Sequence, residues 1–182
     1  MPIRMATSVT VRTVTFWYPA RHLGITNWRV ALAGLFDDEL RPVRRMIAAP
    51  HAGEARGLLA APGEGQPTRC AGGPVYLLDL AGTGAQAAEE AGARHDAWSA
   101  TGRVCGRRPG RVETELLEAG RADYVTYHSQ RRVVGDALII MRTGGWLHPT
   151  GSGPQALIDH VRLAVSTLSE AAPDDVLVTV AV

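Results

Sequence analysis

One histidine lies in a glycine-rich segment that leads into a predicted helix. His148 lies within residues 143–153, and the helix is expected to begin at Pro154. Glycines let the backbone turn sharply or approach a ligand closely. The free N–H groups of the helix would point back toward the segment, so an oxygen bound there would meet them and the imidazole. The segment also contains Gly144, Gly145, Trp146, Gly151 and Gly153.

We therefore predict that residues 143–153 line the principal pocket and that His148 is the leading catalytic candidate. The alternative is that the segment only caps the helix and leaves His148 exposed. The six histidines show no close-paired ligand spacing, so we predict no metal site. Tyr124, Tyr127 and His128, with the arginines that follow them, are a further set that would line a pocket or pack across strands.

A second motif suggests a nucleotide. Gly82-Thr83-Gly84-Ala85-Gln86-Ala87 fits the Gly-x-Gly-x-x-Gly/Ala pattern of dinucleotide-binding turns. Arg107 and Arg108 follow downstream, where a partner for the 2′-phosphate of NADP would stand. An NADP-binding module is one alternative, and a plain tight turn is the other. Because residues 102–106 make a poor second strand, we favour the plain turn and predict no cofactor.

Two cysteines complete the set of reactive side chains. Cys105 is surrounded by arginines, which favour a thiolate, and it is a second and weaker catalytic candidate. Cys70 precedes a glycine pair and a predicted strand. Neither lies at the start of a predicted helix, which would lower the pKa of its thiol, so a structural role is the alternative for both.

The composition is that of an ordinary globular protein. The chain has 182 residues, 46% of them hydrophobic, and a net charge of +1. All 19 basic residues are arginine, so a lysine base or Schiff base is excluded. A nearly neutral chain argues against nucleic-acid binding, and the absence of a long apolar run argues against a membrane span. We expect a single domain over residues 1–182, located in the cytoplasm.

Helical and strand patterns alternate along the chain. Strands are predicted at Val9–Trp17, Val75–Leu80 and Val176–Val182, and strands or one broken strand at Tyr124–His128 and Val133–Met141. Helices are predicted at Asn27–Leu40, from Gly84 to about Trp98, at Arg111–Ala119 and at Gln155–Leu168. The segment near residues 50–70 is rich in Gly, Pro and Ala and is expected to be flexible. This order predicts an α/β layered fold with a mixed, partly parallel sheet.

Several pieces, in this order, resemble the ketosynthases of the thiolase superfamily. Residues 71–80 resemble that family's glycine turn and strand, and residues 85–95 resemble its alanine-rich helix. Residues 144–157 resemble the motif around its second catalytic histidine, and residues 169–178 its last helix-to-strand unit. The resemblance implies a half-thiolase-like fold in polyketide or fatty-acid biosynthesis.

The family's catalytic residues are largely missing. No cysteine stands at a strand-to-helix elbow, and the family's lysine is absent. The resemblance is thus closest to chain-length-factor-like subunits, which do not condense alone and pair with a larger ketosynthase subunit as a heterodimer. An acyl carrier protein would be the second partner, and a cluster of arginines would suit its acidic face, with an ordinary solvated surface as the alternative. These are Arg103, Arg107, Arg108 and Arg111. A small stand-alone enzyme that uses His148 on an acyl or small polar substrate is the alternative.

Overall fold

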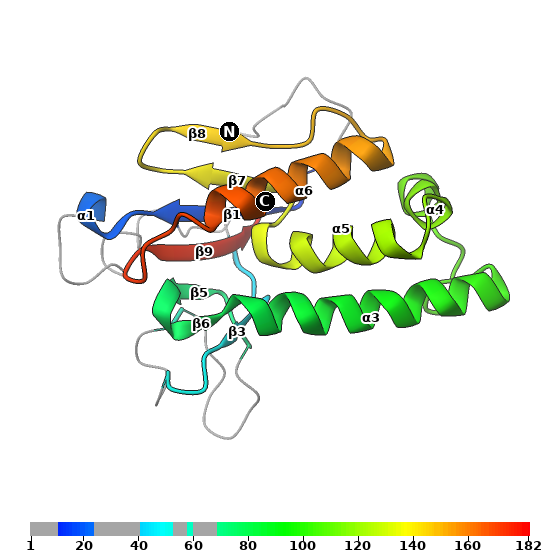
Figure 1. Cartoon of the computed structure of the whole chain (residues 1–182), viewed down its shortest axis with the longest axis horizontal. Helices are drawn as coiled ribbons and strands as arrows, with labels where there is room; N and C mark the ends of the chain where they lie inside the picture. Colours follow the sequence, from blue (N-terminus) through cyan, green and yellow to red (C-terminus); the bar gives the residue numbers. More distant parts are fainter. Residues whose placement is uncertain (1–10, 24–40, 53–57, 60–68) are drawn as a thin grey trace.

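The computed structural model describes residues 11–23, 41–52, 58–59 and 69–182. They form an α/β fold in which one mixed sheet is covered by helices (Figure 1). The predicted helix at Asn27–Leu40 and most of the segment near residues 50–70 lie outside the described residues. The fold class predicted from the sequence is confirmed.

The central sheet is built around β1 (Thr13–Tyr18), which lies between two strands of opposite direction. β7 (Ala137–Ile140) pairs with it in parallel, and β9 (Val176–Ala181) pairs with it antiparallel. β8 (Gly145–Leu147) extends the β7 edge. On the other side, β2 (Arg41–Pro42) and β5 (Gly72–Pro74) both pair with β9. Because β1 and β7 are parallel, their amino ends lie next to each other at the same end of the sheet.

A smaller sheet lies beside the first. Its middle strand is β3 (Met46–Ala48), flanked by β4 (Arg69–Cys70) and β6 (Leu78–Asp79). The predicted strand Val75–Leu80 is therefore only partly correct, because Val75–Leu77 form a 3₁₀ turn, η2, before β6. Gly72, the first residue of β5, lies so close to β9 that a Cβ on it would be 1.9 Å from the carbonyl oxygen of Leu177.

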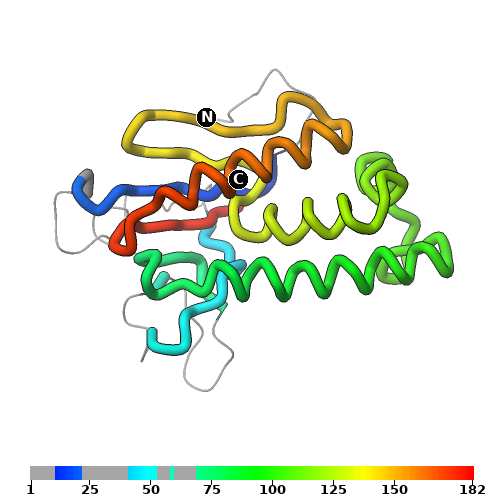
Figure 2. Tube along the Cα trace, viewed as in Figure 1, coloured from blue at the N-terminus to red at the C-terminus, as the bar shows by residue number. Residues whose placement is uncertain are grey.

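Five helices appear in the described part of the chain. α1 (Ala20–Leu23) follows β1, and α4 (Arg111–Glu118) precedes the longer α5 (Arg121–Val134). α3 (Leu80–Thr101) and α5 pack side by side, and α6 (Pro154–Leu168) packs on α5 and lies across the sheet (Figures 1 and 2). The sequence predicted α3, α4 and α6 closely.

Both faces of the sheet are buried. On the helix side, Trp17, Leu138 and Leu177 pack with Val134 and Val161 of α5 and α6. On the other side a second cluster is formed by Val14, Tyr18, Ala137, Val176, Val178 and Val180. Alternation along β1 places Thr13, Thr15 and Trp17 on the helix side. The first of these threonines begins the polar site described below.

The prediction of strands at Tyr124–His128 and at Val133–Val134 is wrong. These residues belong to α5, whose last turn passes through Gly135 into β7. Tyr, Val and Thr favour strands locally. In the folded chain Tyr124 and Val134 are fully buried, so tertiary packing outweighs that local preference.

Candidate functional site

A buried aspartate ties the amino ends of β1 and β7 together. Asp136 comes directly before β7, and its Oδ2 accepts hydrogen bonds from the backbone N–H groups of Arg12 and Thr13, at 2.9 and 3.0 Å. The Thr13 hydroxyl adds a third contact to Oδ2 at 3.2 Å. Gly135 permits the tight turn, because its φ is +74° and a Cβ would lie 2.9 Å from the Thr13 carbonyl oxygen. The carboxylate is thus held at a defined place on the sheet edge.

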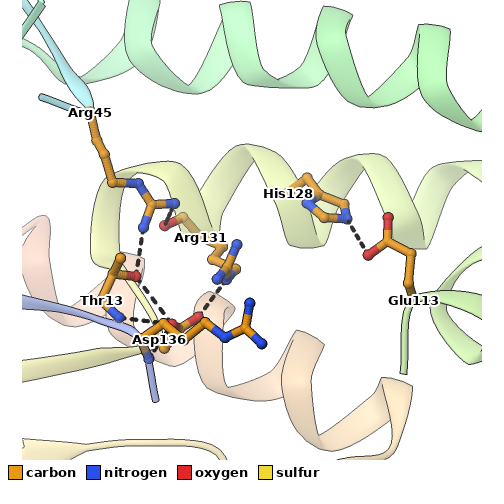
Figure 3. A network of polar contacts seen from close by, with 7 residues as sticks. Thr13, Arg45, Glu113, His128, Arg131 and Asp136 are labelled. Carbon is orange, nitrogen blue, oxygen red and sulfur yellow. Dashed lines mark hydrogen bonds and ion pairs between the residues drawn. The ribbon is translucent and has the colours of Figure 1, made fainter. Parts of the chain in front are cut away.

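Arg131 supplies the charge partner of Asp136. Its Nε donates to Oδ1 at 2.5 Å from the last turn of α5 (Figure 3). Burial opposes ionisation of the carboxyl. The hydrogen bond and charge of Arg131, with the backbone donors, outweigh burial and lower the pKa of Asp136 below its usual value. At neutral pH this pair is ionised and Asp136 is saturated with donors.

A second arginine reaches the same place from the start of the small sheet. Arg45 donates to the Thr13 hydroxyl at 2.6 Å and to the Arg131 carbonyl oxygen at 3.2 Å (Figure 3). Neither contact is with a carboxylate. Burial, and next the charge of Arg131, lower the pKa of Arg45 to about 10, and it remains a cation at neutral pH. Among the described residues, no carboxylate contacts Arg45, so its positive charge is not paired directly.

A polar cavity of about 530 Å³ opens beside these groups. It lies between α4, α5, α6 and the amino ends of β1 and β7, and this volume suits a small organic ligand. Arg12 is exposed and lines the cavity, and its guanidinium has no hydrogen-bond or ion-pair partner in the described part of the chain. Other polar lining residues are Glu113, Tyr127, His128, Arg131, Asp136, Ser152 and His160.

Two histidines of this cavity have an unused ring nitrogen. Nε2 of His128 and Nε2 of His160 are buried and have no hydrogen-bond partner. The His128 side chain is 10% exposed, and His160 as a whole residue is 6% exposed. Buried polar atoms without partners are uncommon and point to a missing partner such as a water or a ligand. Both histidines are among the residues that line the cavity.

His128 faces a carboxylate across the cavity. Its Nε2 lies 3.7 Å from Oε2 of Glu113, beyond hydrogen-bond distance (Figure 3). Tyr124 donates to the other oxygen of Glu113. Burial first, and then the charges of neighbouring arginines, lower the pKa of His128 to about 3. The imidazole is therefore neutral at physiological pH, and its contact with Glu113 is not an ion pair. These arginines are Arg94, Arg131, Arg132 and Arg45.

His160 has a different setting on α6. Burial lowers its pKa to about 4, and His148 adds to this, while the Asp136 charge and a hydrogen bond to the Asp136 backbone act in the other direction. His160 lines the cavity, and its Nε2 is buried without a hydrogen-bond partner.

The segment 143–153 contributes to two cavities. Pro149 and Ser152 line the polar cavity, whereas His148 and Trp146 line a smaller one of about 330 Å³ that also touches His160. Nδ1 of His148 lies 3.0 Å from the Pro149 carbonyl oxygen. The glycines of the segment begin or flank β8 and the first turn of α6, and none of them lines either cavity: Gly144, Gly145, Gly151 and Gly153.

The nucleotide-like motif has another role in the fold. Gly82 to Ala87 lie within α3 and do not form a loop before a helix. Asp79 caps the helix, and its Oδ1 accepts from Gly82 N at 2.7 Å. A carboxylate at that N-terminus occupies the place where a phosphate would bind and repels it. The geometry therefore does not support the NADP alternative.

Neither the two cysteines nor the arginines of the predicted carrier-protein contact are among the residues that line the polar cavity. Cys70 is buried in β4, and burial raises the pKa of its thiol. Cys105 is exposed in the turn between α3 and α4, with φ +48°. Around it lie the four exposed arginines of this turn, of which only Arg111 forms an ion pair within the described residues, with Glu115 at 3.6 Å. The others are Arg103, Arg107 and Arg108.

The described residues give no sign of a metal centre or a membrane span. Within them, no group of three or more His, Cys, Asp or Glu side chains converges on a point that would hold a metal ion. None of their helices has the length and apolar character needed to cross a bilayer.

The sequence identified part of this site and missed the rest. Tyr127, His128 and Arg131 were grouped as one possible pocket lining, although on a strand. Asp136 and His160 were not connected with them. The signal for Asp136 was its place between a glycine and an apolar strand, where a turn residue often hydrogen-bonds the backbone. His160 gave no local signal, because only the packing of α6 brings it to the cavity.

Comparisons of the chain with known protein families, with curated proteins and with solved structures found no match. The function is therefore inferred from the geometry of the polar cavity.

Proposed function

We propose that the polar cavity binds a small organic anion, a carboxylate or phosphate ester, and that its histidines exchange a proton with that molecule. The observation that carries this proposal is that one cavity is lined by two histidines with a buried, unpartnered ring nitrogen and by an arginine with an unpaired guanidinium. A purely structural polar cluster would leave few such groups unsatisfied. Here the cavity is also large enough for a ligand.

The charge of the surroundings favours an anion. Arg12, Arg45 and Arg94 have no carboxylate partner within the described residues, and Arg94 Nε is itself buried without a hydrogen-bond partner. Asp136 is already saturated by its donors and Arg131. Of these three arginines only Arg12 lines the cavity, whereas the charges of Arg45 and Arg94 act on His128, which lines it. Guanidinium groups attract a carboxylate or phosphate. The same field disfavours a metal ion.

The histidines suit proton transfer from the ligand. Both are neutral at physiological pH, because burial lowers their pKa values to about 3 and about 4. A neutral imidazole accepts a proton through its free nitrogen. An anion bound nearby offsets part of the arginine field and makes the imidazole a stronger base. The proposed class is thus an enzyme of acid–base chemistry on a small anionic metabolite.

The test compares two arginine substitutions in binding assays with a panel of small carboxylates and phosphate esters. We expect Arg12→Gln to weaken binding of the best ligand by about tenfold or more, the cost of a hydrogen bond to a charged group. Arg142→Gln, on the exposed turn after β7, removes the same charge elsewhere and should leave affinity unchanged. If no member of the panel binds, or if both variants bind alike, the proposal fails.

A second proposal rests on the arginine turn between α3 and α4. Three of its exposed arginines have no ion-pair partner in the described part of the chain, which suits an acidic protein surface. This supports the chain-length-factor-like hypothesis, in which the acidic partner is an acyl carrier protein and a larger ketosynthase subunit completes the heterodimer. That hypothesis stays a prediction from the sequence.

Charge reversal tests the second proposal. We expect Arg107→Glu with Arg108→Glu to abolish salt-sensitive binding to a carrier protein from the same genome, while Arg142→Glu leaves it intact. No binding by the unmodified protein at low salt would contradict the proposal. Because neither Arg107 nor Arg108 lines the polar cavity, this result is independent of the anion assay.

A further inference from the structure

The charges that line the polar cavity are not all paired. Among the described residues, four charged side chains line it, and two of them, Arg131 and Asp136, form an ion pair at 2.5 Å. The other two, Arg12 and Glu113, have no oppositely charged partner in this part of the chain. His128 lies 3.7 Å from Glu113, but its pKa of about 3 leaves it neutral. The cavity therefore holds one cation and one anion that the fold does not compensate.

The fold uses one oxygen of Glu113 and leaves the other without a hydrogen bond among the described residues. Tyr124, which is fully buried, donates its hydroxyl to Oε1 and so fixes the position of the carboxylate. Oε2 has only His128 beside it, beyond hydrogen-bond distance (Figure 3). The Glu113 side chain is 30% exposed and the residue lines the cavity, so a molecule there can contact it.

The two unpaired charges belong to different parts of the cavity. The Arg12 backbone N–H donates to Asp136 at 2.9 Å, and Arg131 holds the same carboxylate. Glu113 lies beside His128, which precedes Arg131 by one turn of α5 (Figure 3). Three residues of helix rise by about 4.5 Å. A molecule that contacts both charges therefore needs only a few bonds between its own charged groups.

We infer that the ligand of this cavity is a short zwitterion, an amino acid or an amino phosphate ester, whose anionic group meets Arg12 and whose ammonium group meets Glu113. Such a ligand compensates both unpaired charges through charge-assisted hydrogen bonds. A simple carboxylate leaves Glu113 unpaired, and Glu113 repels a second anionic group. The inference rests on the proposed function, because it specifies the anion that the cavity binds.

Neighbouring arginines oppose an ammonium group near His128, and their effect is the weaker one. Arg45 and Arg94 act on this histidine by their charge, but neither lines the cavity. Glu113 does line it and can contact the ligand directly. Because the attraction of two charges falls with their separation, a carboxylate in contact outweighs guanidinium groups farther away.

Ligands of equal length that differ in one end group test this inference on the unmodified protein. Calorimetry at neutral pH would compare pentanoate, 4-aminobutyrate and glutarate, which carry a methyl, an ammonium and a second carboxylate at the same place. Propionate with glycine and butyrate with β-alanine vary the length, and propyl phosphate with 2-aminoethyl phosphate is the phosphate arm. We expect at least one amino member to bind about tenfold more tightly than its methyl counterpart, the usual effect of a hydrogen bond to a charged group. Glutarate should bind no more tightly than pentanoate.

Two substitutions on α4 locate the group that recognises the ammonium. Glu113→Gln removes the charge and keeps a carbonyl acceptor for Tyr124, so the amino members should lose their advantage while the methyl members still bind. Glu115→Gln is the control, because Glu115 pairs with Arg111 and does not line the cavity. Glu113 also lies in the first turn of α4, where a carboxylate stabilises a helix. The readout is therefore the ratio of two affinities in one folded protein, which a loss of stability does not change.

The outcomes separate the two proposals. If anions bind but no amino member exceeds its methyl counterpart in either arm, the inference is overturned and the anion site stands. A preference for the amino members that persists in folded Glu113→Gln, or tighter binding of glutarate than of pentanoate by the unmodified protein, also overturns it. If no ligand of either arm binds, the proposed function itself fails.

Discussion

The two ends of β1 are each closed by a buried aspartate, and they differ in the donors that surround it. At the amino end, Asp136 accepts from backbone N–H groups, a hydroxyl and the guanidinium of Arg131. At the carboxyl end, the donors to Asp175 among the described residues are all neutral. These are the indole of Trp17 at 2.8 Å and the backbone N–H groups of Ala20 and Ala172, each at 3.0 Å.

The difference separates an aspartate that only stabilises the fold from one that also lies at a candidate binding site. Both carboxylates hold the chain segments that meet at their end of the sheet, but only Asp136 lies with unpartnered histidines in a cavity of about 530 Å³. The cavity next to Asp175 has about 280 Å³ and contains no histidine. Satisfied neutral hydrogen bonds stabilise a turn, whereas unsatisfied groups beside fixed charges are kept where a ligand supplies the missing partner.

The largest expected effect comes from neutralising the amino-end carboxylate. Asp136→Asn leaves Arg131, whose side chain is 26% exposed, without its carboxylate, so we expect the free energy of unfolding to fall by about 3–5 kcal/mol. Asp175→Asn removes a hydrogen-bond acceptor but leaves no charged group without its partner. We expect it to lower the free energy of unfolding by about 1–3 kcal/mol. Urea denaturation followed by tryptophan fluorescence measures both.

The exposed neighbour Asp174 provides the control, since Asp174→Asn changes the same charge at the surface and should change stability little. If Asp136→Asn and Asp175→Asn lower the free energy of unfolding equally, the charged partner of Asp136 adds no stability beyond that of neutral donors. A larger loss at Asp175 would reverse the expected order.

The amino end should also make the fold sensitive to mild acid. The unfolded histidines titrate near pH 6.5, whereas burial lowers the pKa of His128 to about 3 and of His160 to about 4. Between these values the unfolded chain binds more protons, so stability falls as the pH falls from about 6.5 to about 4. The slope is at most about 1.4 kcal/mol per pH unit for each histidine. Asp136, whose pKa is lowered, loses its contribution only at still lower pH.

Substitution identifies the source of that slope. His128→Gln removes one buried titrating group and should flatten the dependence of the unfolding free energy on pH between about 6.5 and 4, while the control His51→Gln leaves it unchanged. Denaturant titrations at a series of pH values give the slope. An unchanged slope in His128→Gln would mean that His128 is already accessible to protons in the folded state.

The sequence predicted the scaffold of the site better than its chemistry. The helical period of residues 155–168 and the apolar run of residues 176–182 correspond to α6 and β9, because burial of one face or strand imposes a local pattern. The strand predicted at Tyr124–His128 failed because α5 uses aromatic residues to pack against α3, and such contacts have no local period. His160 and Asp136 meet only after β7 and α6 have packed, which no spacing in the chain reports.

The smallest effect concerns the indole at the carboxyl end. Trp17 Nε1 donates a hydrogen bond to Asp175 Oδ2. If this contact has only a structural role, its coupling energy should be that of one neutral donor on a carboxylate. A double-mutant cycle of Trp17→Phe and Asp175→Asn cancels the volume lost with the indole and isolates the coupling, which we expect to be about 1 kcal/mol. The corresponding cycle of Arg131→Gln and Asp136→Asn should give a clearly larger coupling, because both partners are charged and partly desolvated.

Unfolding free energies of the four proteins in each cycle give the two coupling energies. A coupling at Trp17 equal to that at Arg131 would show that the charge of the amino-end pair adds nothing, and the contrast between the two ends of β1 would then rest on the cavity and its histidines alone.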